Sequence, residues 1–340
     1  MSLKAPRADA LLKSMKACQV LVVGDLMLDR FVYGAVTRIS PEAPVPVVRV
    51  TKETSMPGGA SNVSANLREL GVGAAVAGMI GKDNPGVELR WLLRQEGVDV
   101  ECALPFAGAR TIVKERIIAE RQQVVRVDFE QAADAWPRRQ TEKFLALLAM
   151  KLEAVDGVIV EDYGKGAVTQ EVVDLVMSVA KRRNIPVGLD PKDGHDLAFS
   201  GITVATPNRK EAFAIAGRQD PGPAAEPLAD APLRAVADTL LDKWGAANVA
   251  VTLGPQGMLL ATRGRAVRHV PTRAREVFDV SGAGDTVIAA LVAALAAGAK
   301  FQEAAELSNY AAGVVVGKLG TASCTPAELI AYIRSSGRHG

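Results

Sequence analysis

Residues 270–285, VPTRAREVFDVSGAGD, lead directly into the apolar segment TVIAALVAALAAGA (286–299). Gly282 and Gly284 lack Cβ atoms where this loop turns into a helix, so backbone N–H groups and the positive end of the helix dipole can face an anion. Asp285 stands in the first turn of that helix. A carboxylate beside an anion pocket fits a general base acting on a phosphoryl acceptor, but a glycine-loosened helix start stabilised by an acid has the same pattern.

Composition places the chain among soluble globular proteins. Its 340 residues are 49% hydrophobic and 23% charged, with a net charge of +2. Such a chain lacks the basic field that nucleic-acid binding requires. The three cysteines form no CxxC pair and only three histidines occur, which argues against a disulfide framework and against a His/Cys metal site.

Membrane association is also not expected. The first 19 residues, MSLKAPRADALLKSMKACQ, are too polar for a signal peptide, and the longest apolar run, 287–299, is too short to cross a bilayer. The sequence therefore predicts a cytoplasmic protein.

Apolar runs of strand length alternate with segments of helical period. Because these runs are continuously apolar, they predict strands buried on both faces, as in a parallel sheet between helices. The expected fold is a single domain over 1–340, an α/β doubly wound, mostly parallel sheet flanked by helices. Strands are expected at 18–24, 74–81, 156–161, 185–190, 202–206 and 248–254, and helices at 59–70, 85–95, 139–153, 168–183, 233–244, 283–298 and 302–317.

Two segments, 30–51 and 110–128, alternate apolar and polar residues without a helical period. This pattern predicts a small, half-exposed antiparallel sheet inserted into the domain as a lid. Its apolar face can be buried by closure over a ligand or by a second subunit, and we expect both, with a homodimer formed through the lid. The Pro- and Ala-rich stretch 218–232 is expected to be a surface loop.

Polar residues follow the expected strands, at the edge where open α/β sheets bind ligands. Asp29 could accept hydrogen bonds from sugar hydroxyls, or be an acid of a surface turn. Gly58, Gly59 and Asn62 offer close backbone approach and an amide to a polyol, but also fit a glycine-rich helix cap.

Three further strand ends carry acids beside cations or amides. In EDYGKG (161–166) and DPK (190–192), the lysines could bind phosphate or balance magnesium-held charge, or form solvated ion pairs. Asn208 and Glu211, three residues apart at a helix start, could order magnesium through waters or cap the helix. The segment 252–258, by itself, indicates only a hairpin.

The order and content of these segments resemble the ribokinase-like carbohydrate kinases, the PfkB family, over almost the whole chain. The most specific elements are Gly-Gly-x-x-Asn (58–62), Asn-x-x-Glu (208–211) and DVSGAGD (279–285), which matches the signature around the family's catalytic aspartate. Val280 stands where that family usually has Thr, which affects only fine contacts near the nucleotide.

Within the family, several strings are similar to the bacterial heptose 7-phosphate kinases that serve ADP-heptose and lipopolysaccharide core synthesis. They are GDLMLDRFVYG, TRISPEAPVPVV, PGGASNVSANL, EDYGKG, LDPK, TPNRKE and VVVGKLGTA. Many relatives carry a fused nucleotidyltransferase with a His-x-Gly-His motif, which this sequence lacks, so a stand-alone kinase is expected.

The resemblance implies phosphorylation of the anomeric hydroxyl of D-glycero-β-D-manno-heptose 7-phosphate by ATP and Mg²⁺. It implies that Asp285 is the base and that the amides of Gly282, Ala283 and Gly284 form the anion hole. Asp29, Gly58, Gly59 and Asn62 are implied to hold the sugar. It also allows a monovalent cation such as K⁺ beside the Asp279 loop. The nucleotide is expected along Thr252, Gly254, Gly257 and Asn309, with Mg²⁺ at Asn208 and Glu211.

A sugar phosphate also needs cations. Lys165 and Lys192 are the first choices, since they follow strands that face the expected cleft; Asp162 and Asp190 flank them, and Arg38, Lys114 and Arg116 are the other candidates. Three alternatives stay open at this point: a related kinase acting on another sugar or a nucleoside, a sugar- or nucleotide-binding regulator without catalysis, and a Rossmann dehydrogenase. The dehydrogenase is the weakest, because the Gly-x-Gly lies late in the chain and lacks a third glycine.

Overall fold

The computed structural model describes residues 3–120, 122–130, 138–274, 278–318 and 322–336. Within these ranges, the main sheet contains β1 (Gln19–Gly24), β4 (Gly73–Gly81), β5 (Asp99–Phe106), β8 (Gly157–Glu161), β9 (Val187–Asp190), β10 (Val204–Ala205), β11 (Asn248–Thr252), β12 (Met258–Thr262) and β13 (Arg268–Val270). Their order is β13-β12-β11-β10-β9-β8-β1-β4-β5. Neighbours from β11 to β5 are parallel, and β12 and β13 are antiparallel. The expected mostly parallel α/β fold is confirmed.

Helices cover both faces of the sheet because strand side chains alternate between them. In β1, Val20 and Val22 join one hydrophobic cluster, while Leu21 and Val23 join the other. The first cluster is completed by α1 (Ala5–Met15), α2 (Ala60–Glu69), α3 (Asn84–Gln95), α8 (Ala283–Ala296), α9 (Phe301–Val315) and α10 (Pro326–Ser336). The second is completed by α4 (Arg138–Leu152), α5 (Gln170–Arg183), α6 (Arg209–Ile215) and α7 (Ala231–Lys243).

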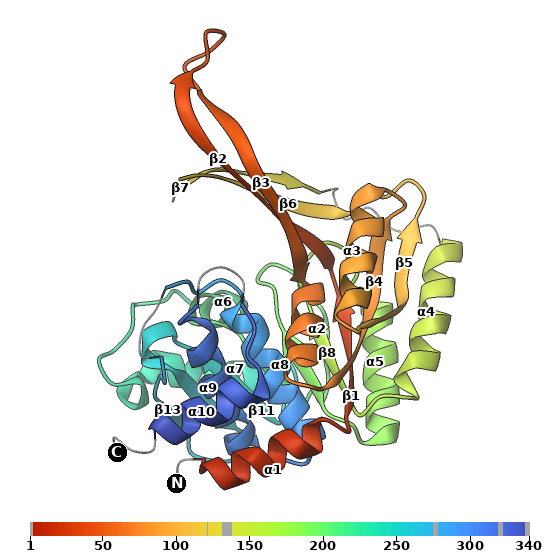
Figure 1. Cartoon of the computed structure of the whole chain (residues 1–340). Coiled ribbons are helices and arrows are strands. Elements are labelled where there is room, and N and C mark those ends of the chain that lie inside the picture. Colours follow the sequence, from red (N-terminus) through yellow and green to blue (C-terminus); the bar gives the residue numbers. More distant parts are fainter. Residues whose placement is uncertain (1–2, 121, 131–137, 275–277, 319–321, 337–340) are drawn as a thin grey trace.

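The lid is a separate four-stranded sheet of order β3-β2-β6-β7, made of β2 (Leu26–Ile39), β3 (Pro46–Gly59), β6 (Ile112–Ala119) and β7 (Gln122–Phe129). It extends away from the main body (Figure 1). The expectation of an all-antiparallel lid is wrong for its central pair, because β2 and β6 are parallel. Both follow parallel strands of the main sheet, β1 and β5, and therefore leave the same sheet edge in the same direction.

Other boundaries also differ from the sequence expectation. The lid strand β2 begins at Leu26 and its partner β3 ends at Gly59. The lid therefore starts directly after β1, the first strand of the main sheet. The strand expected at 202–206 shortens to Val204–Ala205. The strands β5 and β13 and the helices α1 and α10 were not expected. The strands β11 and β12 form the antiparallel hairpin indicated by 252–258, around the 3₁₀ turn Gly254–Gln256.

Candidate active site

The carboxyl ends of the parallel strands bring the polar segments to one edge of the sheet. Gly24 of β1 pairs with Glu161 of β8, and Glu161 pairs with Asp190 of β9. The close approach leaves no room for a side chain at Gly24, where a Cβ atom would lie 2.1 Å from the Glu161 carbonyl oxygen. Acids that are far apart in the sequence are therefore adjacent in the structure.

Asp285 lies at the start of α8, at this edge. Gly282, the residue before the helix, has a φ of +77°, in the left-handed region that favours glycine. The following helix is fixed in place because Thr286 to Ala294 are all buried. The side chain of Asn62, from α2, donates a hydrogen bond to Asp285 Oδ2, and the hydroxyl of Tyr163 lies 3.5 Å from Asp285 Oδ1.

Opposing effects act on the pKa of the Asp285 carboxyl. Removal of water by burial is the largest effect and raises this pKa to about 6. The hydrogen bond from Asn62 and the nearby charge of Lys114 lower it, whereas the charge of Asp29 raises it. The carboxyl is thus adjusted to exchange a proton near neutral pH, which is a property of a general base.

Three carboxylates converge beside this helix start. Oxygens of Glu161, Asp190 and Asp285 lie within 4.8 Å of one another. Glu161 is 1% exposed, and its Oε2 atom has no hydrogen-bond partner. Burial, followed by repulsion from neighbouring acids, raises the pKa of both Glu161 and Asp190 well above the ordinary range. A buried carboxylate oxygen without a partner, next to two further carboxylates, suits a divalent cation with oxygen ligands.

Glu161 was missed as a site residue from the sequence. It ends an apolar strand and precedes an acid, a lysine and two glycines, so it is not distinguishable from an ordinary strand-end acid. Only the pairing of β8 with β9 places it against Asp190.

Asp29 and Arg116 face each other across β2 and β6. Arg116 Nη1 lies 2.6 Å from Asp29 Oδ1, and the guanidinium stacks 5.2 Å from the centre of the Phe31 ring. A Cβ atom at Gly58 on β3 would lie 2.6 Å from Asp29 Oδ2, so a side chain there would displace this carboxylate. Lys114, two residues from Arg116 on β6, places its ammonium group 5.2 Å from the centre of the Tyr163 ring. Burial lowers the pKa of Lys114.

Asp25 organises the loop that carries Tyr163. Its carboxylate accepts hydrogen bonds from the backbone N–H groups of Tyr163, Lys165 and Ala167, each at 3.0 Å. Gly59 packs against the backbone of Asp25. It has a φ of +53°, and a Cβ atom on it would lie 2.7 Å from the Asp25 carbonyl oxygen. The sequence shows Asp25 only as an acid after the first strand, so this role was not predicted.

The other expected cations are engaged elsewhere. Lys165 pairs with Glu130 at 2.7 Å, and Lys192, 45% exposed, pairs with its neighbour Asp193 at 2.8 Å. Arg38 is exposed near the far end of the lid. Of the five candidates, the structure gathers Lys114 and Arg116 around Asp29 and Tyr163.

Asp162, directly after β8, is turned away toward another cavity. Its carboxylate lies 2.7 Å from Nδ1 of His195 and accepts the amide N–H of Gly164 at 2.8 Å. The pair lines a cavity of about 260 Å³ that also includes Lys192.

Asn208 and Glu211 form a capping box at the start of α6. Asn208 Oδ1 accepts the backbone N–H of Glu211 at 3.0 Å, and Glu211 Oε2 accepts the backbone N–H of Asn208 at 2.9 Å. The structure therefore contains the helix cap, which the sequence offered as the alternative to a magnesium site. The Oε1 atom of Glu211 takes no part in these two bonds. Burial raises the pKa of Glu211, and its charge in turn acts on Asp190.

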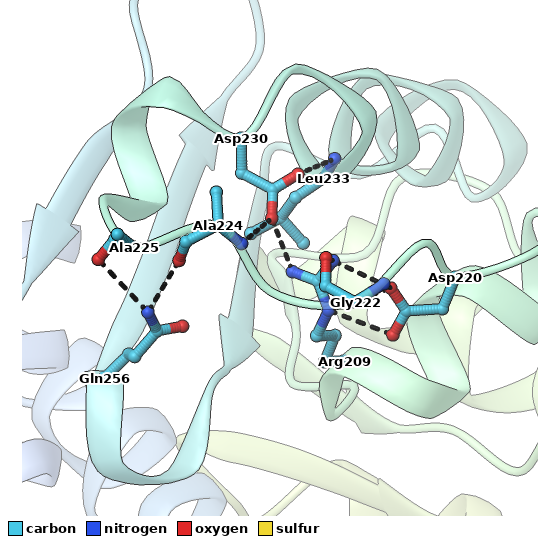
Figure 2. Close-up of polar contacts among 8 residues, drawn as sticks. All are labelled: Arg209, Asp220, Gly222, Ala224, Ala225, Asp230, Leu233 and Gln256. Atoms are coloured by element: carbon cyan, nitrogen blue, oxygen red, sulfur yellow. Dashed lines mark hydrogen bonds and ion pairs between the residues drawn. The ribbon is translucent and has the colours of Figure 1, made fainter.

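The neighbouring Arg209 ties this segment to the surface loop 218–232. It pairs with Asp220 at 2.8 Å and with Asp230 at 2.7 Å, while Gln256 donates to the carbonyl oxygens of Ala224 and Ala225 at 2.8 and 3.3 Å (Figure 2). Since Gln256 belongs to the turn between β11 and β12, the loop holds that turn against the start of α6.

A pocket of about 210 Å³ lies between this turn and the start of α8. The structure brings together here every residue expected along the nucleotide: the lining includes Thr252, Gly254, Gly257, Ala283, Gly284 and Asn309. Asn309 also donates to the Pro271 carbonyl oxygen at 2.7 Å and so fixes the pocket wall. The amide of Ala283 donates to the Val280 carbonyl oxygen at 3.2 Å.

Asp279 lies before this helix start and accepts the Ser281 N–H at 2.9 Å. This contact turns the loop that leads into α8. Across the described ranges, no helix combines the length and the apolar character that a membrane crossing demands.

Comparison with known proteins is consistent with this site. The family described as pfkB family carbohydrate kinase matches residues 18–328. The chain is 43% identical over 326 residues to the bifunctional protein HldE of Trichlorobacter lovleyi, a match that covers 96% of this chain and 65% of that protein. The chain thus spans just under two thirds of the length of this curated relative.

Solved structures share the fold. Phosphofructokinase-2 from Escherichia coli, in complex with substrates and products, has a TM-score of 0.73 at 20% identity, covering 95% of this chain and 100% of that one. Arabidopsis thaliana ribokinase, with ribose and ATP, has a TM-score of 0.70 at 20% identity, covering 94% and 99%. The chain belongs to the pfkB family and is a carbohydrate kinase, as its sequence motifs predicted.

Proposed function

We propose that this kinase transfers the γ-phosphoryl group of ATP to the anomeric hydroxyl of D-glycero-β-D-manno-heptose 7-phosphate, giving the 1,7-bisphosphate for ADP-heptose synthesis. The observation that carries the proposal is the position of Asp285, between the pocket lined by Gly284 and the Asp29–Arg116 pair. The heptose strings and the similarity to HldE support the choice of sugar. Because ATP and sugar phosphates are intracellular metabolites, we place the enzyme in the cytoplasm.

Asp285 would take the proton of the attacking hydroxyl, since its carboxylate is partly desolvated and held by Asn62. Asn62, Asp29 and the glycines 58 and 59 would hold the sugar, and the N–H groups of 282–284 would stabilise charge on the transferred group. The Ala283 amide joins them only if its bond to Val280 opens.

For the phosphate of the acceptor, the structure favours Lys114 and Arg116 over Lys165 and Lys192. Both side chains lie beside Asp29, and the cost of burying the Lys114 ammonium group would be offset by a bound dianion. Arg38 would contribute only from a lid that has closed or that belongs to a second subunit.

Glu161 and Asp190, with Glu211 acting through water, are the residues that would hold magnesium. When bound, the ion would neutralise negative charge on the ATP phosphates. A monovalent cation such as K⁺ beside Asp279 is part of the same proposal, as is a homodimer formed through the lid.

The first experiment is a substrate screen with ADP release as the readout. With ATP and Mg²⁺, heptose 7-phosphate should be preferred over unphosphorylated heptose, ribose and fructose 6-phosphate, and the product should show a new anomeric phosphate by ³¹P NMR. Preference for an unphosphorylated sugar would replace the substrate but leave the kinase class unchanged.

The second experiment is the variant Asp285→Asn. It should lower kcat by about 100- to 10,000-fold, because general base catalysis is lost, while leaving ATP affinity within a few-fold. Asp174→Asn, on the exposed side of α5, is the matched control and should have no effect. Near-normal turnover of Asp285→Asn would remove Asp285 from the role of base.

A further inference from the structure

A closed circuit of hydrogen bonds joins α2 to the start of α8. The hydroxyl of Thr286, the residue after Asp285, has two acceptors within reach: Oδ1 of Asn66 at 2.7 Å and the Gly282 backbone carbonyl at 3.1 Å. It donates its single proton along the shorter contact, to Asn66. The amide nitrogen of Asn66 donates to the Asn62 backbone carbonyl at 2.9 Å and approaches Asn62 Oδ1 at 3.4 Å. Asn62 donates in turn to Asp285 Oδ2. The peptide bond between Asp285 and Thr286 completes the circuit.

The chemistry of the partners fixes the orientation of each amide. The Asn62 backbone carbonyl can only accept, so the Asn66 side chain must present its NH₂ group there and its oxygen to Thr286. Asn66 then also presents an N–H to Asn62 Oδ1, which leaves the NH₂ group of Asn62 for the carboxylate of Asp285. Asn66 and Thr286 are 1% and 0% exposed, so water cannot substitute for a missing partner.

We propose that Asn66 and Thr286 are positioning residues that act through Asn62: they determine that Asn62 presents its NH₂ group, and not its carbonyl oxygen, to the carboxylate of Asp285. This inference rests on the proposed role of Asp285 as the base. Neither residue touches the nucleotide pocket, whose lining includes neither of them.

Loss of the Thr286 hydroxyl leaves the buried Oδ1 of Asn66 without its donor. Unpartnered buried acceptors are unfavourable, so the Asn66 side chain shifts toward another donor. Its bond to the Asn62 backbone carbonyl is kept, but its longer contact to Asn62 Oδ1, at 3.4 Å, is lost, and Asn66 no longer directs the Asn62 amide. The Asn62 carbonyl oxygen can then face Asp285, and two acceptors in contact push the carboxylate away from the acceptor hydroxyl. The geometry of proton transfer is affected, whereas the residues that hold ATP and sugar stay in place.

The test compares Thr286→Val, an isosteric change that removes only the hydroxyl, with Thr286→Ser, which keeps it. Thr286→Val should lower kcat by about tenfold, as loss of an orienting partner commonly does, with the KM values for ATP and sugar phosphate within about twofold. Thr286→Ser should restore kcat. Rates are normalised to the ATP-binding stoichiometry measured by titration calorimetry, so that a fraction of unfolded protein does not count as lost catalysis.

Ser64→Ala is the matched control, because it removes another buried hydroxyl from α2, one that donates only to the Ser61 carbonyl. It should leave kcat unchanged. In the Asp285→Asn background, Thr286→Val should cause no further loss. An equal loss in both backgrounds, or a Thr286→Val enzyme with wild-type kcat, would overturn the proposal.

A second measurement needs no activity. In protein labelled with ¹⁵N-asparagine, the side-chain NH₂ group of Asn62 should exchange slowly with D₂O in the wild type and in Thr286→Ser, and faster in Thr286→Val. Unchanged exchange in Thr286→Val would overturn the circuit. A wild-type chain inactive on every sugar would instead refute the proposed function, and the exchange result would still decide the circuit.

Discussion

Asp285 is the residue whose environment makes the most direct prediction. Only its ionised form can accept a proton, and burial raises its pKa to about 6. Activity should therefore be present above pH 6 and fall as the pH drops through this value, to about a tenth one unit lower. This fall is the acidic limb of the pH profile. Magnesium bound beside Glu161 adds positive charge, which can only lower the pKa of Asp285 and so move the limb to lower pH.

The informative measurement is kcat at saturation between pH 5 and 9, because a sugar phosphate itself titrates near pH 6. The residual activity of Asp285→Asn should lack the limb. A limb centred above pH 7, or one retained in Asp285→Asn, would contradict the assignment.

Two glycines allow sugar and nucleotide contacts to be separated. A Cβ atom at Gly58 would lie 2.6 Å from Asp29 Oδ2, and Asp29 cannot move freely because Arg116 holds it. Gly58→Ala should raise the KM for sugar phosphate by about tenfold or more, the cost of losing a charged hydrogen bond, and leave the KM for ATP unchanged.

Gly313→Ala is the reciprocal control for that variant. Its Cβ atom would lie 3.2 Å from the backbone of Arg273 and Ala274, beside the other pocket. It should raise the KM for ATP and leave that for sugar phosphate unchanged. If both variants changed the same KM, the assignment of the two sites would be wrong.

At the scale of elements, the loop 218–232 is a structural strap and not merely a connection. Arg209 is 13% exposed and pairs with Asp230, which is 3% exposed, and with Asp220 (Figure 2). Arg209→Met should lower the free energy of unfolding by about 2–4 kcal/mol, because it leaves a buried carboxylate unpaired. The KM for ATP should rise as well, since the strap holds Gln256 and the turn that lines the pocket.

Urea unfolding and ATP titration measure the two effects. Lys243→Met breaks the exposed pair with Asp196 and should change stability by only about 0–0.5 kcal/mol. Equal effects of the two variants would show that the strap contributes nothing beyond a surface ion pair.

The sequence predicted elements better than it predicted contacts between them. The apolar run after Asp285 identified α8, and the Asn208–Glu211 spacing allowed for the capping box that the structure contains. The parallel pairing of β2 with β6 escaped prediction, because alternation of side chains gives the faces of a strand but not its direction.

At the scale of the whole molecule, the sheet edge assembles residues from distant segments. That the strand ends would meet was predictable from the parallel topology. Which side chains turn toward the site was not predictable. Lys192 follows a strand end but pairs with Asp193, whereas Lys114 comes from the lid and lies over Tyr163. The circuit of Asn66 and Thr286 likewise depends on how α2 packs against α8, which no local pattern encodes.

The lid also leads to a prediction about assembly. Its far part exposes Ile39 at the end of β2, Val45 in the turn between β2 and β3, and Val50 on β3 by 60, 51 and 48%. These strands extend away from the main core (Figure 1). Because this core cannot bury them, a second copy of the chain is the partner that we propose.

Ile39→Asp combined with Val45→Asp should convert a dimer to monomers, measured by light scattering across protein concentrations. Met150→Asp changes a residue of α4 that is 72% exposed and should leave the mass unchanged. A wild-type monomer at all concentrations, or a double variant that stays dimeric, would contradict assembly through the lid.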